Sequence, residues 1–300
     1  MAHDRDGSSS AGVPASGTGP ATMPPFLRRA DDARGVVTMT LDRPDAFNAL
    51  STGMLDALQA ELDRIADDAG ARVVILAAAG KAFSAGHDLK QMRAEPSQAY
   101  YEALFAQCAR VMLTIQRLPV PVIARVHGIA TAAGCQLVAA CDLAVAAYTA
   151  RFAVSGVNLG LFCSSPSVAL SRNVSRKAAF EMLVTGAFIS AAEAREKGLV
   201  NRVVGAEALD AEVESLVAAI VAKPRVGIAL GKGLFYRQLE RGVEAAYEDA
   251  GRTMACNMMD EAALEGVQAF IEKRKPAWSG WTPREFASSP LSGQPSLSPD

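Results

Sequence analysis

Apolar positions along the chain follow two alternating patterns. Short apolar runs over residues 36–41, 71–79 and 121–126 have the length and the β-branched content of buried strands. Between the first two runs, apolar residues recur every three or four positions, which is one face of an amphipathic helix, at Leu55, Leu58, Leu62 and Ile65. Residues 98–117 predict a second such helix, with Leu104, Cys108 and Phe105 among its buried residues. This alternation predicts an α/β fold with largely parallel strands and helices packed outside.

The character of the chain becomes helical after about residue 152. Ser190 and Glu193 have the spacing of a capping box, and a helix is predicted over residues 206–223, ending at Pro224. Two or three further helices fill residues 226–275. We therefore expect four segments, with bounds at 1–25 for a disordered N-terminal arm, 26–205 for a core, 206–282 for a C-terminal helical region and 283–300 for a disordered tail.

Two turns rich in small residues carry the candidate chemistry. The first is Lys-Ala-Phe-Ser-Ala-Gly-His-Asp-Leu at residues 81–89, and the second is Gly-Ile-Ala-Thr-Ala-Ala-Gly-Cys-Gln-Leu at residues 128–137. Each follows a predicted strand and lets backbone N–H groups approach a ligand closely. Two such turns can form an oxyanion hole, which needs two donors aimed at an oxygen that becomes negative, as a thioester carbonyl does in an enolate.

The two turns resemble those of the crotonase (enoyl-CoA hydratase/isomerase) superfamily, and the likeness covers residues 36–278. It includes Arg-Pro-Asp-Ala-Phe-Asn-Ala-Leu at residues 43–50 and Ala-Phe-Ile-Glu-Lys-Arg-Lys at residues 269–275. The resemblance implies a ClpP-like spiral of ββα units, followed by a helical region that assembles as a homotrimer or a dimer of trimers. It also implies an acyl-CoA thioester as substrate, bound through an oxyanion hole made by the amides of His87 and Ala133.

Further substrate and CoA contacts are implied by matching the family's motifs position by position. They fall at Asp45, Ala46, Phe47, Ala85, Gly86, Asp88, Leu89, Lys90, Ala132, Gly134, Cys163, Ser164, Phe270 and Lys273. Asp88 is more typical of a residue that caps or braces its turn, and Lys273 also fits a solvated helix end. Alanine replaces two of the three glycines that most of the family has around Ala133, which would narrow the pocket.

The two glutamates with which enoyl-CoA hydratases hold a water are missing. Matching places Gln136 and Gly156 at their positions. Glutamine can hold a water but cannot act as a general base, and glycine should leave a hole. The polar side chains left for proton transfer are Gln136, Cys163, Ser164 and the imidazole of His87. Within the superfamily, residues 130–137 and 155–170 are most similar to the subgroup of enoyl-CoA hydratase domain-containing protein 3, which shares this loss.

Two classes of function remain open. The first is a hydratase-like lyase or isomerase of fatty acyl-CoA and lipid metabolism that works by enolate stabilisation. The second is a non-catalytic acyl-CoA binding or scaffold protein. Dinucleotide binding is excluded because neither turn reads Gly-x-Gly-x-x-Gly.

Composition narrows the partners. The 30 Lys and Arg are balanced by 32 Asp and Glu, so no net basic field favours a nucleic acid or a membrane surface. The 3 histidines are far apart and the 5 cysteines lack the spacing of metal sites, so we expect no metal. No cofactor is expected, since CoA is part of the substrate. Unpaired thiols and the lack of a signal-peptide pattern predict a cytoplasmic protein.

Overall fold

A computed structural model describes residues 26–278; the predicted N-terminal arm and the whole of the predicted C-terminal tail lie outside these residues. The main sheet has six strands in the order β1-β2-β3-β5-β7-β10. Its strands are β1 (Leu27–Asp31), β2 (Val36–Leu41), β3 (Val73–Ala78), β5 (Val122–Val126), β7 (Leu143–Ala147) and β10 (Arg202–Val204). All neighbours pair in parallel except β1, which is antiparallel to β2. The strands predicted from the apolar runs are therefore confirmed, with ends shifted by one or two residues.

A second, smaller sheet contains the strands that directly follow β3, β5 and β7, together with β9. Its members, in the order in which they pair, are β4 (Ala82–Ser84), β6 (Ile129–Thr131), β8 (Arg151–Ala153) and β9 (Ile189–Ser190). The chain thus passes from the main sheet to the small sheet and then into a helix, three times in succession. This is the expected spiral of ββα units.

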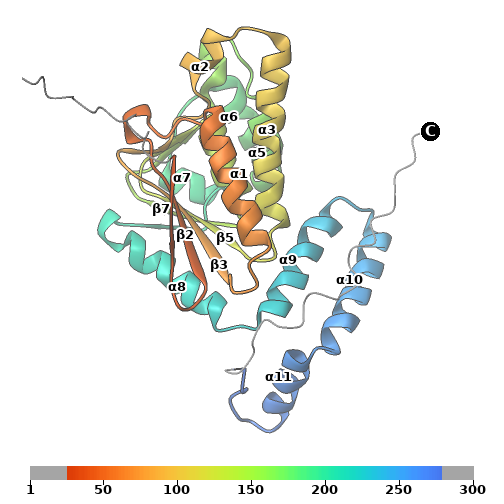
Figure 1. The fold of residues 1–300 in the computed structure, drawn as a ribbon. Helices are drawn as coiled ribbons and strands as arrows, with labels where there is room; N and C mark the ends of the chain where they lie inside the picture. The colour runs from red at the N-terminus through yellow and green to blue at the C-terminus, as the bar shows by residue number, and fades with distance from the viewer. Residues whose placement is uncertain (1–25, 279–300) are drawn as a thin grey trace, which may run out of the picture.

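Helices cover both faces of the main sheet (Figure 1). On one face lie α1 (Thr52–Ala66), α3 (Gln98–Arg117) and α4 (Ala133–Ala140), and on the other lies α8 (Leu209–Val221). Alternation along the strands places Val37 and Val74 in the first core and Val36 and Val73 in the second. Helix α8, which the sequence groups with the C-terminal helices, therefore packs on the sheet of the core.

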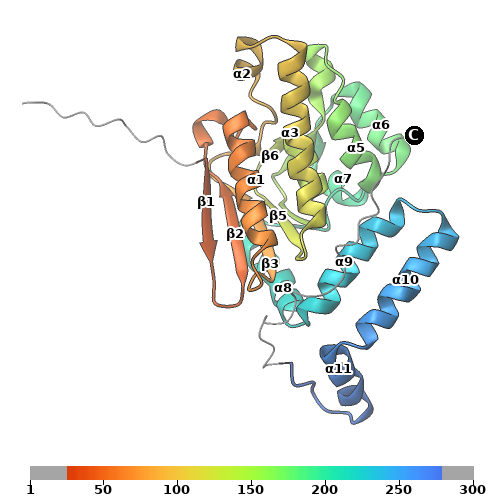
Figure 2. The ribbon, with the colours of Figure 1, turned by 45° about the vertical axis from the view of Figure 1, so that its right-hand side comes forward.

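The remaining helices are short or lie beyond the sheets. They are α2 (Leu89–Ala94), α5 (Ser164–Asn173), α6 (Arg176–Thr185), α7 (Ala191–Glu196), α9 (Arg225–Leu239), α10 (Val243–Met258) and α11 (Glu261–Ile271). The capping box at the start of α7 is confirmed, with Ser190 and Glu193 bonding each other's backbone N–H. Helices α9, α10 and α11 extend away from the core as an arm, which we call the C-terminal arm (Figure 2). No helix within residues 26–278 is long and apolar enough to cross a membrane.

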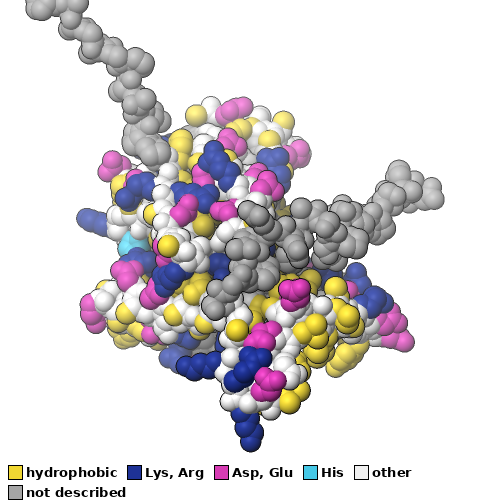
Figure 3. Space-filling model, turned by 60° about the horizontal axis from the view of Figure 1, so that its bottom comes forward, with side chains coloured by type: hydrophobic (Ala, Val, Ile, Leu, Met, Phe, Trp, Pro, Cys, Tyr) yellow, Lys and Arg dark blue, Asp and Glu magenta, His cyan; other side chains and the backbone are white. Residues whose placement is uncertain are grey.

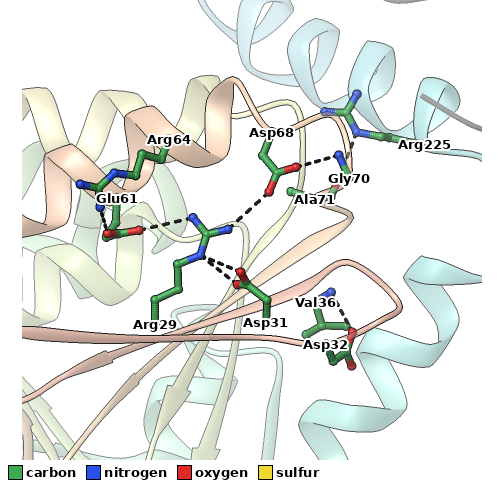
Figure 4. Close-up of polar contacts among 10 residues, drawn as sticks. All are labelled: Arg29, Asp31, Asp32, Val36, Glu61, Arg64, Asp68, Gly70, Ala71 and Arg225. Carbon is green, nitrogen blue, oxygen red and sulfur yellow. Dashed lines mark hydrogen bonds and ion pairs between the residues drawn. The ribbon is translucent and has the colours of Figure 1, made fainter. Parts of the chain in front are cut away.

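Ion pairs tie the antiparallel edge strand to the core. Arg29 on β1 bonds Asp31 on its own strand, Glu61 on α1 and Asp68 in the loop after α1 (Figure 4). Arg225, at the start of α9, donates from Nε to the Ala71 carbonyl at 3.0 Å. These contacts connect β1, α1 and the C-terminal arm around a single loop.

Candidate functional site

The two small-residue turns lie side by side because the strands before them pair. Strands β4 and β6 are parallel, so the chain leaves both at the same edge of the small sheet. Gly86 follows β4 with a φ of +89°, and a Cβ there would lie 2.9 Å from the Ala132 Cβ and 3.1 Å from the Ala133 nitrogen. Only glycine permits both the backbone conformation and this close approach.

The second turn is equally tight. A Cβ on Gly134 would lie 2.3 Å from the Ser84 carbonyl oxygen, so the start of α4 packs directly on β4. Ala132, the N-cap of α4, has φ 51° and ψ −122°, a conformation that glycine adopts readily and alanine avoids. All eight residues of α4 are buried. The turn therefore holds the Ala133 amide at the start of a rigid, enclosed helix.

The amides of His87 and Ala133 are available as donors. Neither amide donates a hydrogen bond to another of residues 26–278. The Ala133 N–H belongs to the first turn of α4, whose amides have no partner within the helix and carry the positive end of its dipole. Two free amides on adjacent turns, one of them at a helix start, suit a site that binds an oxygen with negative charge.

The His87 side chain is held rather than free. Its Nδ1 lies 3.3 Å from the Leu50 carbonyl oxygen, and its ring meets that of Phe105 edge-on at 5.4 Å between centroids. Burial lowers the pKa of His87, so the ring is neutral near pH 7. If Nδ1 carries the proton for Leu50, Nε2 is an acceptor, and this buried atom has no partner among the described residues.

Phe105 is a site residue that the sequence interpretation misplaced. The helical pattern put it on the buried face of α3, whereas it is exposed and packs against His87. Phe105 fits the apolar spacing of α3, but its contact with His87 arises only because the turn after β4 lies close to this helix. The spacing alone could not reveal that contact.

The first loop, residues 43–50, is tied to the turn after β4. The Leu50 amide donates to the Gly86 carbonyl at 2.7 Å, and the Ala85 amide donates to the Phe47 carbonyl at 3.0 Å. Asn48, which sequence reasoning did not single out, is fully buried and bonds the backbone of Arg43, Ala79 and Ala82. It holds the loop in place, with φ +52° at its own backbone.

A pocket of about 420 Å³ lies between this loop and the start of α2. Its lining includes Ala46 and Asp88, two of the expected CoA contacts, together with Arg43 and Gln91. Asp88 accepts the amides of Lys90 and Gln91 and so caps α2, as its position favoured. Asp45, Phe47, Leu89 and Lys90 are exposed nearby. The structure therefore gathers the expected contacts of residues 45–47 and 85–90 around the first turn.

Of the two positions where the glutamates are missing, Gly156 differs from the sequence prediction. Gln136 is 5 % exposed, and its Oε1 is buried with no partner among the described residues. Gly156 does not leave a hole, because a Cβ there would lie 2.6 Å from the Leu161 carbonyl oxygen and 2.7 Å from the Cys163 Sγ. The Gly156 amide donates to that thiol at 3.2 Å. The expected hole is filled by the loop that returns from Gly160.

The thiols near Gly156 are poor nucleophiles. Burial raises the pKa of Cys163, and it raises the pKa of Cys135 to about 12. At neutral pH both are protonated and pack as apolar groups. Ser164 begins α5 and its Oγ lies 3.4 Å from the Phe162 carbonyl oxygen, with the side chain exposed.

Two expected CoA contacts are not brought to this site within one chain. Phe270 lies on α11 and Lys273 lies two residues after the end of that helix, at the far end of the C-terminal arm from the two turns (Figures 1 and 2). The Phe270 side chain is 85 % exposed. Residues 26–278 contain no group of three or more His, Cys, Asp or Glu side chains placed to hold a metal.

Comparison with known proteins agrees with this architecture. Residues 31–281 match the model of the enoyl-CoA hydratase/isomerase family. The chain belongs to this family. Among curated proteins, it is 47% identical over 245 residues to the mitochondrial enoyl-CoA hydratase domain-containing protein 3 of Xenopus laevis, which covers 82% of this chain and 83% of the relative. The human protein of that name is 45% identical over 256 residues, covering 85% of this chain and 84% of the relative.

Solved structures of family members are similar throughout the described chain. A crystal structure of enoyl-CoA hydratase from Mycobacterium smegmatis has 68% sequence identity and a TM-score of 0.85, covering 85% of this chain and 100% of that one. The crystal structure of human enoyl-CoA hydratase domain-containing protein 3 has 43% identity and a TM-score of 0.81, covering 84% of this chain and 100% of that one. Both the family and the subgroup inferred from the motifs are confirmed.

The expected cytoplasmic location is wrong on this comparison. The curated relatives at 47% and 45% identity are named as mitochondrial proteins, not cytoplasmic ones. The expectation rested on free thiols and on the absence of a signal-peptide pattern. Neither feature separates the cytoplasm from another reducing compartment.

Proposed function

We propose that this protein binds acyl-CoA thioesters and polarises the thioester carbonyl between the amides of His87 and Ala133. The observation that carries the proposal is the contact of the two turns, with Gly86 against Ala133 and neither amide bonded within the described part of the chain. Donors fixed before the ligand arrives stabilise an enolate oxygen more than a neutral carbonyl, because no reorganisation is needed as charge develops. The reaction class is that of a hydratase-like lyase or an isomerase.

We propose His87 as the group that moves a proton in this reaction. Its Nε2 is buried and has no partner among residues 26–278, while Gln136 cannot ionise and the buried thiols are protonated. The low pKa of the ring keeps it neutral and ready to accept a proton. This arrangement would replace the missing pair of glutamates by a single base, and we therefore expect a modest rate.

The competing function is a non-catalytic acyl-CoA binding or scaffold protein. It is favoured by the filled space at Gly156, where no glutamate side chain could be restored without displacing Leu161 and Cys163. A panel of enoyl-CoA substrates separates the two functions, since an enzyme turns over at least one member and a scaffold binds without turnover. Crotonyl-CoA hydration should be at least ~10³-fold slower than that of a member with both glutamates, because one to two proton-transfer groups are missing and each contributes ~10²–10⁴-fold.

The backbone origin of the site has its own test. Ala133→Pro removes one donor at the first position of α4, where proline is tolerated, and should weaken binding of an enolate-like CoA-thioester analogue by about 3 to 4 kcal/mol. Ala133→Gly keeps the N–H and serves as the matched control, with affinity close to that of the unmodified protein. Equal affinities for the proline and glycine variants, measured by titration calorimetry, would remove Ala133 from the proposal.

We further propose that the protein assembles as a homotrimer or a dimer of trimers through its C-terminal arm. Apolar side chains gather at this end of the molecule (Figure 3), and those of α10, α11 and the turn between them that are exposed in one chain include Val243, Tyr247, Met254, Met259, Leu264, Phe270 and Ile271. An apolar surface of this extent marks a protein interface. In such an assembly, Phe270 and Lys273 of one copy would contact the CoA bound to another copy, which they do not reach within their own chain.

A further inference from the structure

The C-terminal arm is attached to the core largely through charged side chains. Three residues of α9 are buried, namely Arg225, Val226 and Lys232, so its buried face carries two cations and a single apolar residue. The buried residue of α10 is Asp249, which pairs with Arg237 of α9 and with Arg241 in the turn between α9 and α10, rather than with the core. An amphipathic helix normally docks through an apolar stripe, whereas two of the three buried residues of α9 are charged.

Lys232 uses its ammonium group completely. Its Nζ donates to the carbonyl oxygens of Ile115 at 2.8 Å and Val120 at 2.9 Å, and to Oδ2 of Asp142 at 2.6 Å. The Lys232 side chain is 6 % exposed. The Ile115 carbonyl belongs to the last turn of α3, where carbonyls lack helical partners and favour a cation. The ammonium therefore holds α9 against the end of α3, where the two helices meet in Figure 1.

Asp142 connects Lys232 of α9 to β5 and to the end of α4. Its Oδ1 accepts the Tyr236 hydroxyl at 2.8 Å, and its Oδ2 also accepts the Val122 amide of β5 at 2.6 Å. Its own amide donates to the Val122 carbonyl at 3.0 Å. Asp142 directly follows Cys141, the C-cap of α4. Burial lowers the pKa of Lys232, while the Asp142 carboxylate opposes this change.

We infer that Lys232, Asp142 and Tyr236 form a polar joint that sets the direction of the C-terminal arm and fixes the end of α4 to it. Lys232 is the positioning residue, because it alone bonds α3, the loop before β5 and Asp142. A buried ion pair adds little net stability over apolar packing, but it permits one geometry in which its donors are satisfied. The joint thus fixes the direction in which the C-terminal arm leaves the core.

Amide hydrogen exchange of the full chain tests the joint. Lys232→Met leaves Asp142 buried without its cation, so peptides from α9 and from the end of α4 should lose protection by roughly 100-fold or more. Peptides from α1, which does not touch the joint, should keep theirs. Lys177→Met, the same change at an exposed site on α6, is the matched control and should alter no peptide of α9.

Two results would overturn the inference. One is unchanged exchange in α9, and the other is an equal loss of protection in α1 and α9, which would mean general destabilisation. Should Lys232→Met fail to fold, Tyr236→Phe removes one hydrogen bond to a charged group and should lower α9 protection by roughly 10-fold. Unchanged α9 exchange in that variant would count against the joint in the same way.

A double variant tests whether the two charges act as a pair. Asp142→Asn combined with Lys232→Met removes the unpaired carboxylate and should recover part of the α9 protection lost in Lys232→Met alone. If the loss of α9 protection in the double variant equals the product of the losses in the two single variants, the residues act independently and the joint is disproved.

Discussion

Ala132 holds a backbone conformation that strains an L-residue, one position before a proposed donor. Its φ of 51° with ψ −122° disfavours any side chain with a Cβ. Such a backbone conformation costs the folded protein ~1–3 kcal/mol when the residue has a Cβ. Glycine avoids this strain but costs ~0.5–1 kcal/mol, because it is more flexible in the unfolded chain. Ala132→Gly should therefore raise the free energy of unfolding by about 1 kcal/mol, measured by urea denaturation. An unchanged or lower midpoint would show that the turn carries no strain.

His87 should give the protein a specific pH dependence. Its pKa is below the ordinary 6.5 because burial disfavours the charged ring. Between the folded and unfolded pKa values the unfolded chain binds the proton and the folded chain does not, so stability falls as the pH drops below about 6.5 and levels off below the folded pKa. Above 6.5 the His87 contribution is constant.

His87→Gln isolates this contribution, because glutamine keeps a polar side chain but does not titrate. The difference in free energy of unfolding between the unmodified protein and the variant should be constant from pH 8 to about 6.5 and should then shift against the unmodified protein. Parallel stability curves across pH 5 to 8 would show that burial does not perturb His87.

At the scale of helices and strands, the chain's pattern was informative wherever neighbours in sequence are also neighbours in space. The apolar runs predicted β2, β3 and β5, and the spacing of Leu55 and Leu58 predicted α1, because each depends on one face of one element. The juxtaposition of the turns after β4 and β6 came from a family resemblance, and the parallel pairing of these strands provides its physical basis.

The remaining features depend on contacts between distant segments. Gly156 lacks the predicted hole because the chain returns after Gly160 and places Leu161 and Cys163 in that space. Phe105 follows a helical period, yet its partner is His87, on a turn that precedes α3. No periodicity reveals that the buried face of α9 is made by Arg225 and Lys232.

At the scale of the whole molecule, the C-terminal arm predicts self-association. Tyr247 on α10 is 77 % exposed, so Tyr247→Glu should fold normally but weaken the assembly by placing charges in an apolar interface. Tyr148→Glu is the matched control, because Tyr148 is 70 % exposed but lies outside the C-terminal arm, directly after β7. This variant should leave the mass of the assembly unchanged. Sedimentation velocity gives the mass of each. A monomeric unmodified protein, or no difference between the two variants, would contradict assembly through the arm.

A crystal structure with an enolate-like CoA-thioester analogue would show whether one thioester oxygen binds the amides of both His87 and Ala133. We expect this oxygen to lie about 2.7–3.1 Å from the backbone nitrogens of both residues, with the CoA passing along residues 45–47 and 88–90. An oxygen bonded to only one of these nitrogens, or a thioester bound away from the turns after β4 and β6, would contradict this expectation.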